Sequence, residues 1–240
     1  MKETEYLVKK ALSAPALDGQ WDSEAWANAE TLTIAWFHPR SSGHRPVTEA
    51  RVLYTLEGIH VIFRVQDRYV LSTRTEYQSQ VCSDACVEFF LQPLPGIDPN
   101  HRITAGKPTP GYFNFEMNCG GTLLLRYVTN PARPDKDSDL AAYEKVPWEQ
   151  TSRIRVFHSM PATVAPEIQE AVEWVNQYFV PFALFEPYVG PIGGVSGQVW
   201  YGNFYKCAED CSHPHWATWA PIGEALNFHT PEYFAPLRLE

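Results

Sequence analysis

The chain has 240 residues, of which 45% are hydrophobic and 20% charged, and a formal net charge of −9 at pH 7. This is enough apolar material for a sizeable core, and one all-β domain spanning residues 1–240 is the simplest interpretation. The acidic balance, without a local Lys/Arg cluster, removes the basic surface that nucleic-acid binding needs. No apolar run reaches the roughly 18 residues of a membrane span. We therefore predict neither a nucleic-acid nor a membrane partner.

The first segment, MKETEYLVKKALSAPALDG, lacks the apolar centre of an export signal. We expect a soluble, cytoplasmic protein, although a chain already trimmed of such a signal would look the same. The five cysteines are an odd number, which argues against a fully paired disulfide framework. Two cysteine pairs have i, i+4 spacing, Cys82/Cys86 and Cys207/Cys211. Whether either pair forms a disulfide or binds a metal stays open, as does the oligomeric state.

Alternation of apolar and polar residues runs through most of the chain, and 20 prolines and 14 glycines interrupt it. This pattern predicts an antiparallel β-sandwich with long loops and little helix. Residues 50–67 contain two alternating runs around Glu57-Gly58, which is a tight-hairpin signal. The second run directs Phe63 toward the core and Arg64 to the opposite face.

Two further strands carry polar side chains on one face. Residues 83–93 alternate so that Glu88 lies opposite an apolar face, and residues 112–121 place three polar side chains opposite Phe113, Phe115 and Met117: Asn114, Glu116 and Asn118. Such a face is often simply solvated. Amide and carboxylate groups also suit hydrogen bonds to hydroxyl groups, so both interpretations stay open.

The second half of the chain continues the β pattern. We expect strands within 153–158, 170–182 and 198–207, and one helical turn within 182–190. Residues 92–109 and 129–148 are predicted to be long loops, which are often functional in a compact domain.

The stretch CSHPHWATW, Cys211 to Trp219, concentrates unusual side chains. Together with Cys207, its cysteine and histidines are zinc-ligand types, but Pro214 stiffens the chain between the histidines and no second half of a finger follows. We rank a ligand platform first, a structural loop second and a metal site third.

Tryptophans divide into two groups. Three lie in apolar runs and are predicted to be core residues: Trp26, Trp36 and Trp174. Trp216 and Trp219 are predicted to lie in a loop rich in Pro, His and Ser, where a flat ring can be presented to the apolar face of a sugar.

Glu88 and Glu116 are the candidate pair for glycoside hydrolysis, which needs two carboxyl groups about 5 to 10 Å apart. No G-x-S-x-G, P-loop or H-E-x-x-H motif is present. Catalysis therefore remains an alternative that no recognised catalytic motif supports.

Several segments resemble, in the same order, family 9 carbohydrate-binding modules and their stand-alone relatives. They are LDGQWDSEAW (17–26), VIFRVQD (61–67), SDACVEFFLQP (83–93), YFNFEMNCGGTLL (112–124), WYGNFYKC (200–207) and HWATWAPI…NFHTPEYFAPLRLE (215–240).

The resemblance implies an immunoglobulin- or jelly-roll-like β-sandwich of the DOMON-like type that binds oligosaccharides or monosaccharide ends without catalysis, in carbohydrate catabolism. It also implies calcium as a structural ion in some members. It carries ligand contacts over to Glu88 and Asn203. The position of a first clamping ring holds Val81 and Cys82, which leaves Trp216 or Trp219 as the more credible platform.

We therefore predict non-catalytic carbohydrate binding, with no catalytic residue and no metal ligand assigned. The alternatives are a small glycoside-acting enzyme and an interaction module that has lost sugar binding. The predicted ligand-binding residues are Arg64, Glu88, Asn114, Glu116, Asn118, Asn203, Lys206, Trp216 and Trp219.

Overall fold

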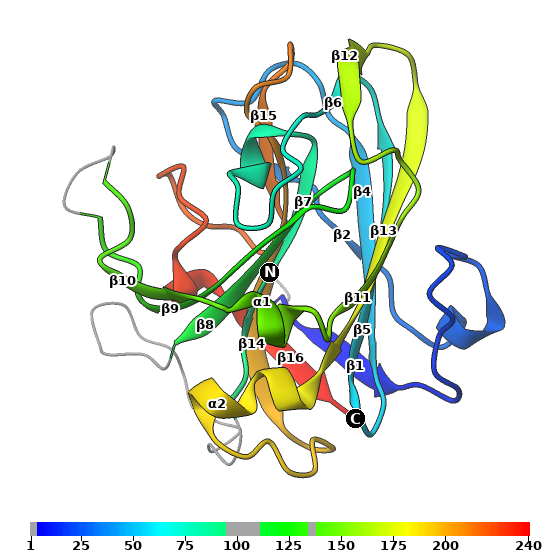
Figure 1. The fold of residues 1–240 in the computed structure, drawn as a ribbon, viewed down its shortest axis with the longest axis vertical. Coiled ribbons are helices and arrows are strands. Elements are labelled where there is room, and N and C mark those ends of the chain that lie inside the picture. The colour runs from blue at the N-terminus through cyan, green and yellow to red at the C-terminus, as the bar shows by residue number, and fades with distance from the viewer. Residues whose placement is uncertain (1–3, 95–110, 134–137) are drawn as a thin grey trace.

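Two β-sheets pack face to face in the computed structural model, which describes residues 4–94, 111–133 and 138–240 (Figure 1). Sheet I contains, in spatial order, β10 (Ala142–Lys145), β9 (Leu123–Asn130), β8 (Tyr112–Asn118), β7 (Cys86–Gln92), β14 (Val199–Ala208), β16 (Ala235–Leu239) and β1 (Tyr6–Lys10). Sheet II continues from β1 through β4 (Val47–Tyr54), β5 (Gly58–Asp67), β13 (Val172–Pro181) and β11 (Arg155–His158).

Short elements extend the two sheets. β15 (His215–Thr218) pairs with β14 and with β3 (Trp36–Phe37), β2 (Leu32–Thr33) pairs with β4, and β6 (Val70–Ser72) pairs with β12 (Val164–Ile168). Helical structure in the described residues is limited to α1 (Trp148–Thr151), α2 (Glu186–Val189) and the 3-10 turns Glu24–Trp26, Val81–Ser83, Phe182–Leu184 and Pro231–Tyr233. The all-β sandwich predicted from the sequence is confirmed, as is the helical turn within 182–190.

β1 joins the two sheets. Its residues 6–8 pair in parallel with residues 237–239 of β16, and Lys9 and Lys10 pair in parallel with Leu53 and Tyr54 of β4. The other pairings between described strands are antiparallel, so β1 is where the sandwich departs from the expected antiparallel pattern.

The core between the sheets follows from strand alternation. Phe63 of β5, Phe89 of β7 and Phe204 of β14 are all fully buried, and the rings of Phe89 and Phe204 stack with centroids 4.3 Å apart. Burying one such ring contributes roughly 1.5 to 3 kcal/mol. Since these residues point inward, their neighbours along each strand point to the outer face.

Lys206 of β14 also points between the sheets, where it is fully buried. Its Nζ lies 3.4 Å from Oδ2 of Asp67 on β5 and donates to Nε2 of His215 (2.9 Å) and to the carbonyl of Cys207 (3.0 Å). His44 Nε2 lies 2.7 Å from the other oxygen of Asp67. Burial alone would raise the pKa of Asp67, but the Lys206 charge and the His44 hydrogen bond lower that pKa far below its usual value. Lys206 thus bridges the two sheets.

The structure corrects two predictions. Trp26 and Trp174 are buried as expected, but Trp36 is 58% exposed, because β3 is a two-residue strand at the sheet margin that pairs only with β15 among the described strands. Part of the predicted loop 129–148 is strand, because β10 pairs with β9; most of the predicted loop 92–109 lies outside the described residues.

The helices of the described residues are all far too short or too polar to be membrane spans.

Replacing Asp67 with Asn should lower the free energy of unfolding at neutral pH by about 3 kcal/mol, because Lys206 would be left as an uncompensated buried charge. Urea unfolding monitored by tryptophan fluorescence measures this change. The lowered pKa of Asp67 also means that the wild type keeps this contribution above about pH 4 and loses it as the pH falls further.

Glu49→Gln is the matched control, since Glu49 forms an ion pair with Arg64 in which both side chains are about one-quarter exposed. That variant should lose less than about 1 kcal/mol. Equal losses for the two variants would contradict a special role for the buried pair.

Candidate functional site

Side chains on the outer face of sheet I form rows across the strands, because neighbouring strands fix which residues lie side by side. In one row Tyr205, Glu88 and Glu116 are consecutive cross-strand neighbours. In the next row Trp216, Cys207 and Cys86 are neighbours in the same way. The two rows bring a carboxyl pair next to an indole ring and two thiols.

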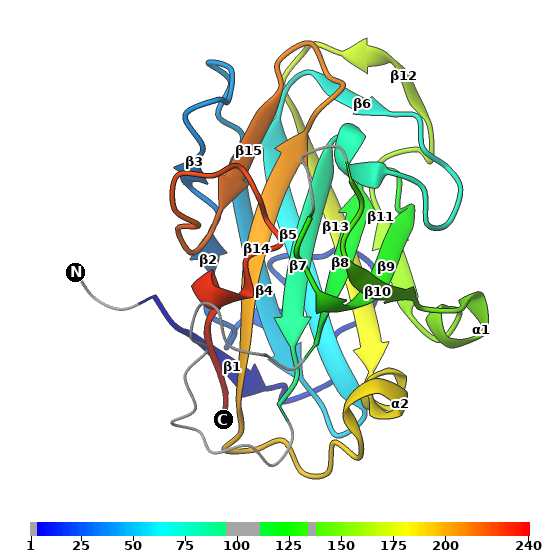
Figure 2. The ribbon, with the colours of Figure 1, turned by 90° about the vertical axis from the view of Figure 1, so that its left-hand side faces the viewer.

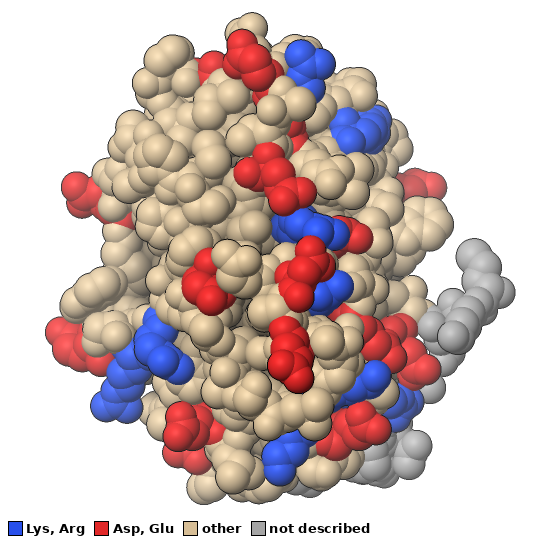
Figure 3. Space-filling view, turned by 90° about the vertical axis from the view of Figure 1, so that its right-hand side faces the viewer, with Lys and Arg blue, Asp and Glu red and all other residues tan. Residues whose placement is uncertain are grey.

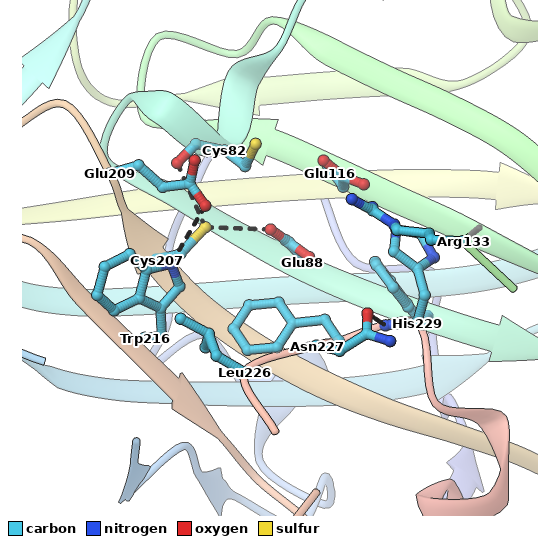
Figure 4. A pocket seen from close by; sticks show the side chains of 12 residues that line it. Cys82, Glu88, Glu116, Arg133, Cys207, Glu209, Trp216, Leu226, Asn227 and His229 are labelled. Atoms are coloured by element: carbon cyan, nitrogen blue, oxygen red, sulfur yellow. Dashed lines mark hydrogen bonds between the residues drawn. The ribbon is translucent and has the colours of Figure 1, made fainter. Parts of the chain in front are cut away.

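A cavity of about 420 Å³ opens over these rows (Figure 4). The segment between β15 and β16 supplies a wall of the cavity, and Figure 2 shows sheet I from this side with that segment at its margin. The volume is in the range of small-molecule sites. The lining residues are Cys82, Glu88, Phe90, Glu116, Arg133, Cys207, Glu209, Trp216, Leu226, Asn227, Phe228 and His229.

Glu88 and Glu116 are only 3% and 6% exposed, although both line the cavity. Burial, and then the neighbouring Glu116 carboxyl, raise the pKa of Glu88 well above its usual value. Burial also raises the pKa of Glu116, which accepts a 2.7 Å hydrogen bond from Asn114. The pair therefore holds protons more tightly than free carboxyl groups do, so a carboxylic acid O–H donor persists there to a higher pH than on a free glutamate.

Trp216 lies at one side of the cavity and is half-buried. Its Nε1 donates to Oε1 of Glu209 (3.2 Å), and its backbone N–H donates to the hydroxyl of Ser41 (3.0 Å). Figure 4 shows the indole beside Leu226 and Cys207. A ring held at both its side chain and its backbone offers a pre-formed apolar surface.

The opposite side of the cavity is formed by His229 and Arg133 (Figure 4). His229 Nδ1 lies 2.7 Å from the hydroxyl of Tyr112. Burial, followed by the positive charges of Arg133 and Arg126, lowers the pKa of His229 to about 3. The imidazole is therefore neutral at physiological pH and can take part in hydrogen bonds without adding charge.

Three predicted ligand-binding amides lie on the correct face but are fully buried and bonded within the protein. Asn203 bonds the backbone of Ala220, Asn118 donates to Asp84 and the Arg74 carbonyl, and Asn114 bonds Glu116. None of these amides lines the cavity. Asn114 contributes to the cavity indirectly, because it donates a hydrogen bond to the carboxyl group of Glu116, which lines the cavity.

The structure does not bring Arg64, Lys206 or Trp219 to the cavity. Arg64 lies on the outer face of sheet II, where it pairs with Glu49 and covers the Trp21 ring. Figure 3 shows the side of the molecule that is on the right in Figure 1, with charges of both signs interspersed. Trp219 is 8% exposed and packs edge-on against Tyr6 and Phe204, because the segment predicted as a loop contains strand β15.

The cysteines around Cys211 form no disulfide. All five cysteines are free thiols, and Cys211 donates to the carbonyl of Ala208. Among the described residues, the side chains whose ligating atoms gather closely are Cys86, Glu88 and Cys207. The zinc-ligand types weighed in the sequence and ranked third do not gather in this way. Thiols are poor calcium ligands, so this group does not fit the calcium ion that the resemblance implies.

Sequence reasoning did not identify Cys86, Arg133, Asn227 or His229 as parts of the site. The position of Cys86 beside Glu88 could have been predicted from strand alternation, because Cys86 is two residues before Glu88 and therefore lies on the same strand face. Asn227 and His229 reach the cavity only through the path of the segment between β15 and β16, which no local pattern encodes.

The model of carbohydrate-binding family 9 matches residues 20–239 of the chain. The chain belongs to this family. No curated protein matches this family 9 module.

Two proteins of known structure resemble the family 9 module. A "putative carbohydrate-binding protein" from Bacteroides uniformis is 24% identical, with a TM-score of 0.79, and the match covers 98% of this chain and 99% of that one. A family 9 module from Caldicellulosiruptor kristjanssonii, solved with glucose and with cellotriose, is 12% identical, with a TM-score of 0.62. Those two matches cover 99% of this chain and 96% and 94% of the other chains. These likenesses show a shared fold.

Replacing Glu116 with Gln should stabilise the family 9 module at neutral and alkaline pH by about 1 kcal/mol or more. Because the pKa of Glu116 is raised in the folded state, its protonated form contributes fully to the free energy of unfolding at acid pH. That contribution is lost as the pH rises through the pKa of the folded state. Glutamine removes that loss and still accepts from Asn114. Chemical denaturation at about pH 4 and about pH 8 measures the difference, which should appear only at the higher pH.

Glu209→Gln is the control within the same cavity, because Glu209 is exposed. It should leave stability almost unchanged at both pH values. A destabilised Glu116→Gln protein at the higher pH would contradict the raised pKa.

Proposed function

We propose that this module binds a saccharide in the cavity lined by Glu88, Glu116 and Trp216. The observation that carries the proposal is the meeting of two buried carboxyl groups and a fixed indole ring in one cavity. A sugar presents hydroxyl groups at its rim and C–H groups on its faces. The cavity offers hydrogen-bonding groups on its floor and an apolar ring at its side, so the two surfaces are complementary.

The carboxyl pair suits hydroxyl recognition because of its raised pKa values. Two neighbouring carboxyl groups of which one is protonated provide one O–H donor and several acceptor lone pairs. A sugar hydroxyl both donates and accepts. The pair can therefore satisfy it in a buried place, where an unmade hydrogen bond costs about 1 to 3 kcal/mol.

Family membership supports the same assignment, and the relative from Caldicellulosiruptor kristjanssonii, solved with glucose and with cellotriose, suggests the ligands to test first. The stacking role that we assign to Trp216 depends on its half-buried position beside the carboxyl pair. Trp219, in the core, has no such role.

Trp216→Ala should weaken the binding of cellotriose by roughly 1 to 3 kcal/mol, because the apolar surface that covers the sugar is removed. Isothermal titration calorimetry measures the affinity. Trp36→Ala is the matched control: Trp36 is a tryptophan with an accessible ring that does not line the cavity, and its loss should not change affinity. Equal affinity for wild type and Trp216→Ala would remove Trp216 from the site.

Glu88→Gln should weaken the binding of glucose and cellotriose by about 1 to 3 kcal/mol, the usual cost of a buried hydrogen bond that is left unmade. Arg64→Gln should bind as the wild type does, since Arg64 lies on the other sheet. Absence of binding by the wild type across a glycan array would favour an interaction module without a sugar ligand.

A glycoside-acting enzyme is the second candidate, because Glu88 and Glu116 are cross-strand neighbours in one cavity. Hydrolysis needs carboxyl groups on both sides of the scissile bond, whereas these two lie side by side on one sheet. Incubation with oligosaccharides should therefore give no new reducing ends. Activity that Glu88→Gln abolishes would replace binding with catalysis.

A further inference from the structure

Three of the five cysteines gather at one side of the cavity, where saccharide binding gives them no role. Cys86 and Cys207 are cross-strand neighbours on β7 and β14. Cys82 lies in the turn before β7, and its carbonyl accepts from the thiol of Cys207 (3.6 Å). These three thiols are free and pack together with Leu124 and Trp216. Free thiols so close to a carboxyl group call for a chemical explanation.

The ligating atoms are close enough to share one ion. The sulfurs of Cys86 and Cys207 and a carboxylate oxygen of Glu88 all lie within 4.8 Å of one another, and the Cys207 sulfur is 3.1 Å from Oε1 of Glu88. A tetrahedral ion with bonds of about 2.0 to 2.3 Å holds its ligands about 3.5 Å apart. Small side-chain movements on two paired strands are sufficient to reach that spacing.

The chemical types of the three ligating atoms indicate which metal ion would bind. Two sulfurs and one carboxylate suit zinc, whereas calcium and magnesium prefer oxygen ligands alone. All three side chains are almost fully buried. A divalent cation would balance two thiolates and leave the carboxylate as the third ligand.

We propose that Cys86, Glu88 and Cys207 bind a zinc ion at the side of the cavity. Each thiol releases its proton to solvent as a sulfur–zinc bond forms, and any proton held by Glu88 is released in the same way, so that Glu88 binds as the carboxylate. Cys207 and Glu88 both line the cavity, so the fourth coordination position faces it and is available to water or a ligand hydroxyl. The proposal goes beyond saccharide binding and does not depend on it.

Cobalt titration of the full-length, EDTA-treated protein tests the site. Co²⁺ should bind with a stoichiometry of one and give the charge-transfer absorption of thiolate–cobalt bonds, and Zn²⁺ should remove that absorption. Cys86→Ser and Cys207→Ser should each lose it. Cys211→Ser should retain it, because Cys211 is a buried cysteine that bonds elsewhere, to Ala208.

A measurement on the wild type alone guards against variants that fail to fold. Calorimetric titration with Zn²⁺ in two buffers of different ionisation enthalpy should show the release of at least two protons, one from each thiol together with any proton held by Glu88. No charge-transfer band in the wild type, or an equal band in Cys207→Ser, would overturn the proposal.

Saccharide binding and zinc binding at this cavity can be contradicted independently of each other. EDTA-treated protein that binds cellotriose but neither Co²⁺ nor Zn²⁺ would overturn the zinc site alone. Protein that binds zinc through the two thiols but no saccharide would support the zinc site and contradict saccharide binding.

Discussion

The buried ion pair between Lys206 and Asp67 determines which side chains of β14 form the cavity. Successive residues of a strand point to opposite faces, so a Lys206 that faces Asp67 between the sheets requires Tyr205 and Cys207 to face outward. A shift of β14 by one residue would move Lys206 to the outside and bring Cys207 into the core. Asp67 would then be a buried carboxylate without its cation, at a cost of several kcal/mol.

The cavity itself uses side chains that lower the stability of the fold. Glu88 and Glu116 are desolvated and repel one another, and the thiol of Cys207 and the amide of Asn114 only partly offset this cost. Such groups are tolerated because the large aromatic core below them supplies the favourable free energy. Since they stand on paired strands and not on loops, their positions are fixed before a ligand arrives, and little ordering entropy remains to be lost on binding.

Strand alternation in the sequence was sufficient to place Glu88 and Glu116 on outward faces, opposite Phe89 and Phe115. The same rule separates Asn203 from Lys206, which are three residues apart on one strand and must face opposite ways, so their joint assignment to a ligand site was avoidable. It also separates Trp216 from Trp219. The prolines, histidines and serine around these tryptophans concealed strand β15, and a loop was predicted in its place.

Other features depend on long-range pairing, which no local pattern contains. The meeting of Cys86 with Cys207, and of Glu88 with Glu116, follows from the register of β7 against β14 and β8. Arg64 was correctly predicted to face away from the core, but whether its strand shares a sheet with Glu88 is decided by the topology. Neighbouring-strand register was therefore the missing information for the site.

The parallel pairing of β1 with β16 has a consequence for biosynthesis. β16, near the end of the chain, lies between β14 and β1, and β1 in turn connects to sheet II. A growing polypeptide on the ribosome therefore cannot close the sandwich until residues 235–239 have emerged. Until then residues 6–8 of β1 and 199–202 of β14 have an unpaired edge, and unpaired strand edges are sites where one chain can pair with another.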